Sequence, residues 1–220
     1  MIRKLYEHRF ELFLGTQILI LFGSLFFPLN FFEDILLPVL FSLNIAAGIL
    51  LISKKKGLMW FFIALFLIAA VSFGGGMFSK EAGPYIQIRL AVYFIFHIIV
   101  TLEIIKQVWQ ARLVNKTVII GLMSGYISLG FLGFFLFLSI DLWEPNSFSG
   151  ILMDNAGFDT RADNLMYYAY ITLLTIGYGE IVPVTQIAQK AAILVGLTGQ
   201  FYLVIITAVV VEKYIRHSTK

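Results

Sequence analysis

The chain has 220 residues, of which 60% are hydrophobic and only 13% are charged. Soluble domains are roughly 45–50% apolar and about 25% charged, so this composition indicates a membrane protein with several spans. The net charge of +3 does not indicate a nucleic-acid-binding surface, and the absence of cysteine excludes disulfides and thiolate metal sites.

Six segments are apolar and long enough to cross a membrane as helices, which takes about 20 residues each. The first follows Arg3 and Lys4 but has no small-residue cleavage site at its end, so we expect a retained helix rather than a signal peptide. The predicted spans are 10–29, 32–53, 58–78, 85–108, 117–140 and 185–212.

The basic residues are unequally divided between the two ends of these spans. Twelve of the sixteen fall on one side, and the other four are Lys80, Arg89, Arg161 and Lys190. Because basic residues accumulate on the cytoplasmic side, we predict a multi-pass protein of the cell membrane with both termini in the cytoplasm. The connection between the last two spans is then external.

That external connection contains an unusual motif, Thr-Ile-Gly-Tyr-Gly at 175–179, followed by Glu180. Glycine at alternate positions permits dihedral angles that other residues avoid, so successive carbonyl oxygens can point the same way. Stacked rings of such oxygens, from several chains around one axis, can replace the hydration shell of a potassium ion. Residues 163–174 are too few to span a membrane, and Asp163 or Asn164 is suited to cap a short re-entrant helix there.

The motif resembles the Thr-Val-Gly-Tyr-Gly selectivity filter of the tetrameric potassium channel family, with Ile176 in place of valine. The resemblance implies an all-α membrane protein with six transmembrane helices, a re-entrant pore helix and a filter loop, assembled as a homotetramer around a central pore. It implies a voltage-sensor-like domain at 1–116 and a pore domain at 117–220. The implied parts of the pore domain are an outer helix 117–140, a turret 141–162, a pore helix 163–174, the filter 175–179 and an inner helix 185–212.

The same resemblance implies roles for individual residues. Potassium, the permeant ion, would bind in the filter at Thr175, Ile176, Gly177, Tyr178 and Gly179, with ligands from the first four. Side chains behind the filter would support it, at Tyr167, Tyr168, Thr172 and Glu180. Glu180 replaces the usual aspartate, and Ile171 stands where some relatives carry a glutamate that pairs with it. Gly196 and Gly199 are candidates for a gating hinge in the inner helix, with close helix packing as the alternative.

The first four spans occupy the place of a voltage sensor, but they lack its arginine series. A sensor carries a basic residue at every third position of its fourth helix. Counted from Arg89, those positions hold uncharged residues, Val92, Ile95, Ile98, Thr101 and Ile104. We therefore expect weak or no intrinsic voltage dependence. His97 in this helix is either a proton sensor or a structural residue, and helical spacing predicts that Glu103 pairs with Lys106 or Gln107.

Three further features lie outside the motif. Gly121 and Gly125 form a Gly-x-x-x-Gly pattern that predicts close contact between helices. The basic cluster Lys54–Lys56 is a stop and orientation signal, and it can also contact anionic lipid. Only eight residues follow Glu212, so we expect no cytoplasmic ligand-binding domain after the last span.

Other functions fit the sequence less completely. A cation channel that discriminates poorly between potassium and sodium would often replace Tyr178, and a potassium transporter subunit would carry several degenerate filters. A membrane protein whose filter has lost conduction is another alternative. An intramembrane enzyme would depend on Glu103 and Asp141, which lack a partner carboxylate, a Ser–Lys pair or a metal cluster. The histidines, at His8, His97 and His217, are too far apart in the sequence for metal-ligand spacing. For these reasons we expect neither an enzyme nor a cofactor. We expect passive, potassium-selective conduction, with the bilayer and other copies of the chain as partners and no nucleic acid.

Overall fold

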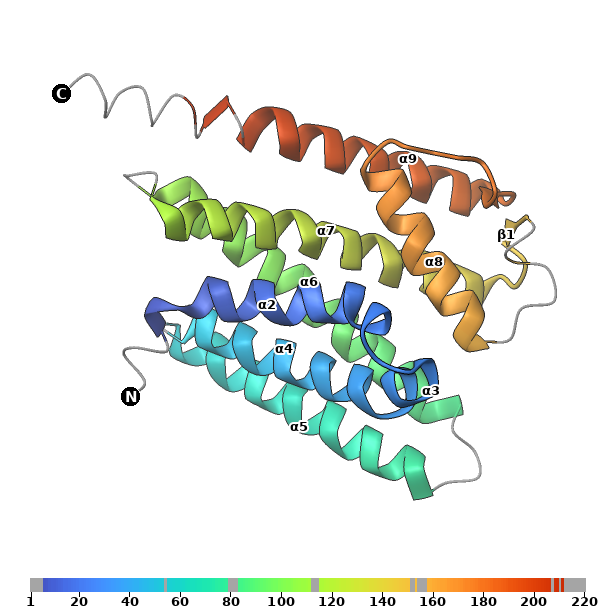
Figure 1. Cartoon of the computed structure of the whole chain (residues 1–220), viewed down its shortest axis with the longest axis horizontal. Coiled ribbons are helices and arrows are strands. Elements are labelled where there is room, and N and C mark those ends of the chain that lie inside the picture. Colours follow the sequence, from blue (N-terminus) through green and yellow to red (C-terminus); the bar gives the residue numbers. More distant parts are fainter. Residues whose placement is uncertain are drawn as a thin grey trace. The chain divides into compact units, whose positions relative to one another are not determined.

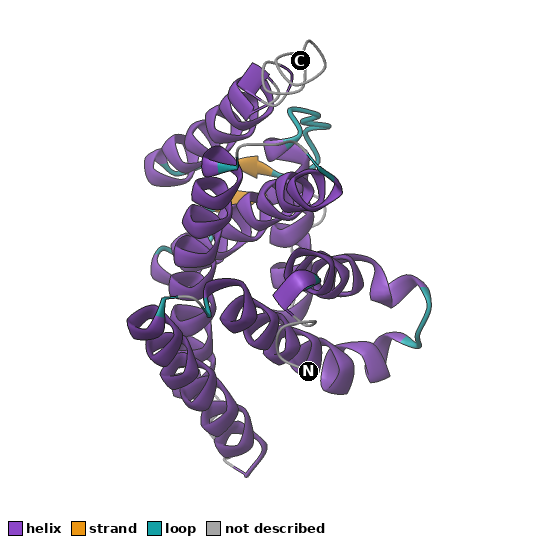
Figure 2. Cartoon of the chain, turned by 90° about the vertical axis from the view of Figure 1, so that its left-hand side faces the viewer, coloured by secondary structure: helices purple, strands orange, loops and turns teal. Residues whose placement is uncertain are grey.

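The structure is a computed structural model, and it describes residues 6–53, 55–78, 83–111, 115–150, 153, 158–206, 208–209 and 211. This part of the chain is mostly helical, with two short strands (Figure 2). The chain divides into two compact units, Met1–Gly125 and Tyr126–Lys220. The division lies within α7 (Lys116–Trp143), which begins in the first unit and ends in the second, rather than at residue 116.

The first unit is a set of helices, shown from blue to green in Figure 1. Within it α2 packs against α4, α4 against α5, and α5 against α6. The first helix ends short of the predicted residue 29, and Pro28 in an extended conformation precedes the next helical run. The elements are α2 (Arg9–Phe22), the 3-10 turn η1 (Gly23–Leu25), α3 (Leu29–Phe31), the π-helical η2 (Phe32–Leu36), α4 (Leu37–Ile52), α5 (Lys56–Phe78) and α6 (Gly83–Gln110).

Aromatic rings fill the centre of this unit. Phe13 of α2, Phe62 of α5 and Phe96 of α6 are fully buried. The ring centroid of Phe96 lies 6.3 Å from that of Phe13 and 5.1 Å from that of Phe62. Gly48 of α4 leaves room for the same ring, because a Cβ there would lie 2.5 Å from two of its atoms. The Phe96 ring thus joins α6 to the other three helices.

Two polar residues of α6, His97 and Glu103, interact with other groups of the first unit. His97 is fully buried, and its Nδ1 lies 2.9 Å from the Tyr93 carbonyl oxygen one turn earlier. The prediction that Glu103 pairs with Lys106 or Gln107 is wrong, because the Glu103 carboxylate is directed to Lys55 at the connection between α4 and α5 and forms an ion pair with it.

The Gly121 part of the Gly-x-x-x-Gly prediction is confirmed within the first unit. A Cβ on Gly121 would lie 3.2 Å from a methyl carbon of Val108 and 3.3 Å from the Phe10 ring. Ser124 lies one turn after Gly121 in α7, and its carbonyl oxygen accepts a hydrogen bond of 3.3 Å from the Gln17 side-chain amide of α2. The small residue therefore allows the first part of α7 to approach α2 and α6 closely.

Several of the described helices are suited to cross a membrane. Three are long and apolar enough, Gln87–Gln110, Lys116–Trp143 and Gln186–Ile205. Two shorter apolar stretches are Leu37–Ile52 and Lys56–Val71. The chain is therefore a multi-pass membrane protein, while the number of six spans and the direction of the termini stay predictions.

The second unit contains the end of α7, two helices of 16 residues each and a two-stranded sheet. Its elements are β1 (Phe148–Ser149), α8 (Phe158–Leu173), β2 (Val182–Pro183), α9 (Gln186–Phe201) and the π-helical η3 (Tyr202–Ile206). The strands are antiparallel, with Phe148 opposite Pro183 and Ser149 opposite Val182, and α8 packs against α9.

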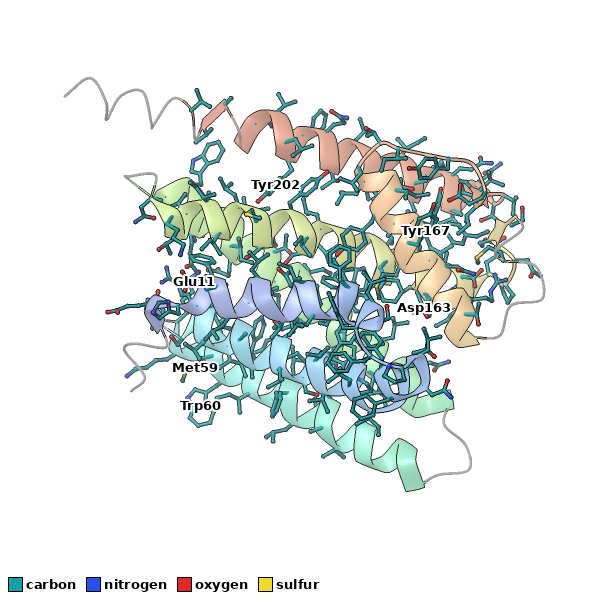
Figure 3. All side chains as sticks on the ribbon, viewed as in Figure 1. Glu11, Met59, Trp60, Asp163, Tyr167 and Tyr202 are labelled. Atoms are coloured by element: carbon teal, nitrogen blue, oxygen red, sulfur yellow. The ribbon has the colours of Figure 1, made fainter. Side chains whose placement is uncertain are left out.

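The short helix starts earlier than predicted. Because α8 begins at Phe158, Asp163 and Asn164 lie inside it and not at its N-terminus, so the predicted cap is wrong. Asp163 is labelled on α8 in Figure 3. The added first turn contains Arg161, whose guanidinium is bound by Asp141 of α7. This long-range ion pair stabilises a turn that the local sequence pattern did not indicate.

Candidate functional site

The Thr-Ile-Gly-Tyr-Gly motif follows directly from the C-terminal end of α8. The backbone leaves the helix after Leu173 and is non-helical through the motif. Backbone N–H groups still tie its start to the last turn of α8. Thr175 donates to the Thr172 carbonyl oxygen at 3.0 Å, and Ile176 donates to that of Ile171 at 2.8 Å. The end of the short helix therefore sets the direction in which the motif begins.

The sign of the backbone angle φ alternates along the motif. Thr175, Gly177 and Gly179 have φ values of 57°, 58° and 93°. Glycine adopts such angles freely, and the prediction that these glycines use dihedrals that other residues avoid is confirmed. A β-branched residue avoids them, so the conformation of Thr175 costs roughly 1–3 kcal/mol and must be held by its surroundings. Strain of this kind is concentrated at functional sites.

A single chain leaves the motif largely uncovered. The side chain of Ile176 is 46% exposed and that of Tyr178 is 73% exposed. The neighbouring helix α9 also exposes large apolar side chains, at Ile193, Leu194, Leu197 and Phe201. These surfaces are available to lipid or to further copies of the chain.

Tyr167 of α8 contacts the residue that follows the motif. Its hydroxyl donates a hydrogen bond to a carboxylate oxygen of Glu180. This bond raises the pKa of Tyr167 to about 12, so the phenol stays protonated and able to donate at physiological pH. The residue is labelled on α8, a helix too short to span a membrane, in Figure 3. Tyr167 thus links the middle of α8 to the far end of the motif.

Tyr168 faces a different set of residues. It is buried, and its ring centroid lies 5.0 Å from that of Phe137 in α7 and 5.6 Å from that of Phe148 in β1. Its phenol interacts with Thr172 one turn further along α8. Of the four predicted support residues, the structure brings Tyr167 and Glu180 together, while Tyr168 anchors α8 to α7 and β1.

An ion pair fixes the start of α8. Arg161 binds both carboxylate oxygens of Asp141, with Nε 2.9 Å from Oδ2 and Nη2 2.6 Å from Oδ1. Its third nitrogen, Nη1, donates to the Met153 carbonyl oxygen at 3.0 Å. The two side chains are only 19% and 8% exposed. One guanidinium thus joins the end of α7, the first turn of α8 and the segment between them.

The start of α9 is held by Ser147, which lies just before β1. The Val184 N–H donates to the Ser147 carbonyl oxygen at 2.9 Å, and the Thr185 hydroxyl donates to the Ser147 hydroxyl at 3.1 Å. Thr185 also caps α9 by accepting a bond from the Ala188 N–H. The chain after the motif is therefore attached to the end of α7.

The two predicted hinge glycines of α9 differ in their surroundings. A Cβ on Gly199 would overlap the Leu173 carbonyl oxygen and lie 3.1 Å from its carbonyl carbon, whereas the nearest atom to one on Gly196 is the Thr172 carbonyl oxygen, at 3.8 Å. Close packing therefore explains Gly199, and the hinge role of both glycines stays a prediction. Next to Gly199, the Gln200 amide donates to the Thr175 hydroxyl at 3.3 Å.

Sequence reasoning missed several residues that hold this site. Gln200 and Arg161 could have been noticed as polar residues in apolar surroundings. Tyr126 gave no such signal, yet its hydroxyl lies 3.3 Å from the Leu173 carbonyl oxygen at the end of α8. Among the described residues, no three histidine, aspartate or glutamate side chains gather to hold a metal ion. The motif itself offers strained backbone, hydroxyls and apolar side chains, and the charged groups around it are Glu180 and the Asp141–Arg161 pair.

Comparison with known protein families found a match that covers this site. Neither the curated proteins nor the solved structures contain a match to the chain. Residues 122–216 match the model of a protein family described as an ion channel, and this range contains α8, the motif and α9. The part of the chain that contains the motif is therefore similar to an ion-channel domain, and the protein is not an enzyme.

Proposed function

We propose that four copies of this chain surround a central pore and conduct potassium passively and selectively, with residues 175–179 of each copy lining the ion path. The observation that carries the proposal is the Thr-Ile-Gly-Tyr-Gly motif in strained, non-helical backbone at the end of a short helix. The number four comes from the resemblance to the tetrameric potassium channel family. The match of residues 122–216 to an ion-channel family supports the same class of function.

The chemistry follows from the backbone. Left-handed angles at alternate residues allow successive carbonyl groups to face one side, and rings of such oxygens can replace the hydration shell of potassium. The motif lies immediately after α8, so the partial negative charge at that helix end favours a cation there. Non-helical backbone at membrane depth is tolerated only where protein buries it or where it lines an aqueous path. Its exposure in a single chain supports the second condition.

The first unit supports a channel with weak or no intrinsic voltage dependence. Moving one charge across the membrane contributes about 2.3 kcal/mol per 100 mV, so steep gating needs several charges. The positions of α6 that would carry these charges, every third residue after Arg89, are occupied by uncharged residues. Val92, Thr101 and Ile104 are buried, and Ile95 and Ile98 are more exposed. In the proposed orientation both termini are cytoplasmic and the filter lies toward the outside.

Ion flux tests the proposal directly. Purified protein in liposomes loaded with potassium should release potassium into sodium buffer, and barium should block the flux. Gly177→Ala should abolish it, because alanine at a φ of 58° costs roughly 1–2 kcal/mol in each chain and displaces the neighbouring oxygens. Size measurements on both proteins should show that they assemble equally.

Each other outcome of the flux measurement would contradict a part of the proposal. Equal fluxes of sodium and potassium would favour a poorly selective cation channel. An absence of flux from intact tetramers would contradict conduction under these conditions. Selective flux that survives Gly177→Ala would show that residues 175–179 are not the filter.

Tyr167→Phe should weaken selectivity without preventing assembly. The substitution removes the hydroxyl that binds Glu180 and leaves the ring in place, so the chain immediately after the motif loses one restraint. We expect a severalfold fall in the permeability ratio of potassium to sodium, measured from reversal potentials in planar bilayers. Tyr168→Phe is the matched control, because it also removes one tyrosine hydroxyl from α8, but that hydroxyl interacts with Thr172 within the helix and not with Glu180. Equal ratios in both variants would contradict a supporting role for the Tyr167 hydroxyl.

A further inference from the structure

The first unit contains a cavity of about 730 Å³ that the proposed conduction does not use. It lies at the end of the unit where α2 begins and where α4 and α6 end, with the connections that lead into α5 and into α7 close by. Binding pockets for small molecules and cofactors are about 300–1,000 Å³, so the size suits a ligand or a lipid headgroup. In Figure 1 these ends lie toward the left-hand side of the picture.

Three cations from three parts of the chain line this cavity, namely Arg9, Lys55 and Lys106. Two acids also line it, Glu7 and Glu103, so the formal balance is positive. Glu103 is occupied by its ion pair with Lys55. Lys106 has no ion-pair partner among the residues that the structure describes. Two of the three cations are therefore available to an added anion.

Arg9 provides the observation that points to a ligand. Its guanidinium is half-buried, and it contacts only neutral groups in the described chain. Nη1 donates to the Tyr6 carbonyl oxygen at 3.1 Å, and Nε lies 3.4 Å from the Gln107 side-chain oxygen. The guanidinium carbon lies 4.2 Å from the Tyr6 ring centroid and 4.6 Å from that of Phe10. A partly desolvated cation normally has an anionic partner, and a guanidinium matches a phosphate group especially well.

The rest of the cavity wall favours a phospholipid over a soluble phosphate as the ligand. Apolar side chains line it beside the cations, including Phe10, Leu51 and Val108. A soluble phosphate gains nothing from such a surface, whereas a phospholipid has glycerol and acyl chains to place there. In the predicted orientation this end of the unit faces the cytoplasmic leaflet, which holds anionic lipids. We propose that this cavity binds the phosphate headgroup of an anionic phospholipid, with Arg9 and Lys106 as its main contacts.

Binding can be measured without ion flux, so the result is independent of the channel proposal. We would titrate the purified full chain with dioctanoyl phosphatidylglycerol and count adducts by native mass spectrometry. Dioctanoyl phosphatidylcholine and glycerol phosphate are the zwitterionic and soluble probes. We expect saturable binding of the anionic lipid, much weaker binding of the zwitterionic lipid, and weak binding of glycerol phosphate that competes with the anionic lipid.

Charge-neutral variants locate the site. Arg9→Gln and Lys106→Gln should each weaken binding about tenfold, as expected for one charge-assisted contact to phosphate. Lys116→Gln is the matched control, because Lys116 is nearby and basic but is exposed, pairs with Glu11 at 3.6 Å and does not line the cavity. Equal losses in all three variants would mean general electrostatic attraction and would overturn the site. Glycerol phosphate binding as tightly as the lipid would overturn the lipid assignment.

Discussion

Gly199→Ala should clearly destabilise the second unit, whereas Gly196→Ala should be tolerated. An added Cβ at residue 199 would overlap the carbonyl oxygen of Leu173, a backbone atom at the end of α8. That oxygen cannot move without moving the start of the 175–179 motif. Overpacking a helix contact typically costs about 1–3 kcal/mol, and a clash with backbone lies at the upper end. Thermal unfolding in detergent should show a clear loss of stability for Gly199→Ala.

Gly196→Ala is the matched control in the same helix. Its new methyl group would meet only the Thr172 carbonyl oxygen at 3.8 Å, an ordinary contact. Alanine is the better helix former by roughly 0.5–1 kcal/mol, so stability should be unchanged or slightly higher. If Gly199 served only as a hinge, Gly199→Ala would fold as well as Gly196→Ala and would change gating alone. Equal stability of the two variants would therefore contradict the packing explanation.

Arg161→Gln should be among the most destabilising substitutions of a charged residue in this chain. It leaves the Asp141 carboxylate, only 8% exposed, without its cation and removes the donor to the Met153 carbonyl oxygen. Breaking a buried pair costs about 3–5 kcal/mol, and partial exposure of this one places the expected loss near 3 kcal/mol. By contrast, Lys116→Gln breaks an exposed pair with Glu11 and should change stability by about 1 kcal/mol or less.

A double variant measures the interaction energy between Asp141 and Arg161 separately from their contacts with other residues. Asp141→Asn combined with Arg161→Gln removes both charges, so the stability of the double variant should exceed that expected from adding the two single losses. Arg161→Lys keeps the charge but cannot bind both carboxylate oxygens, and it should fall between wild type and Arg161→Gln. Unfolding midpoints in chemical denaturant should be measured for wild type, the two single variants, the double variant and Arg161→Lys. Simple additivity of the two single losses would show that Asp141 and Arg161 are not coupled.

Local features of the site were readable from the sequence. Alternate glycines predicted the left-handed angles at Gly177 and Gly179, because only residues without a Cβ adopt them at little cost. The short length of the apolar run before the motif predicted a short helix, and α8 is one. Gly121 in a Gly-x-x-x-Gly pattern predicted close helix contact for the same kind of reason. In each case the signal in the sequence spans only a few residues, although the atoms that Gly121 lets approach belong to the distant residues Phe10 and Val108.

Long-range pairing was not readable in this way. Glu103 has Lys106 and Gln107 at helical spacing, but Lys55 reaches it from another helix. The start of α8 depends on Asp141, twenty residues before Arg161. The contact that explains Gly199 comes from the backbone of Leu173, which no sequence pattern displays. Such partners are chosen when helices pack, so periodicity along one helix cannot identify them.

The fit of the Phe96 ring against Gly48 has a mechanical consequence for the first unit. A voltage sensor works because one helix can slide past its neighbours, and sliding steps between packed elements are about one turn, or 5.4 Å. Here a bulky ring on α6 sits at the one residue of α4 that has no side chain, with Phe13 and Phe62 on its other sides. Any such step would drive the ring against a neighbouring side chain. We therefore expect α2, α4, α5 and α6 to resist sliding past one another and to move as a single rigid body.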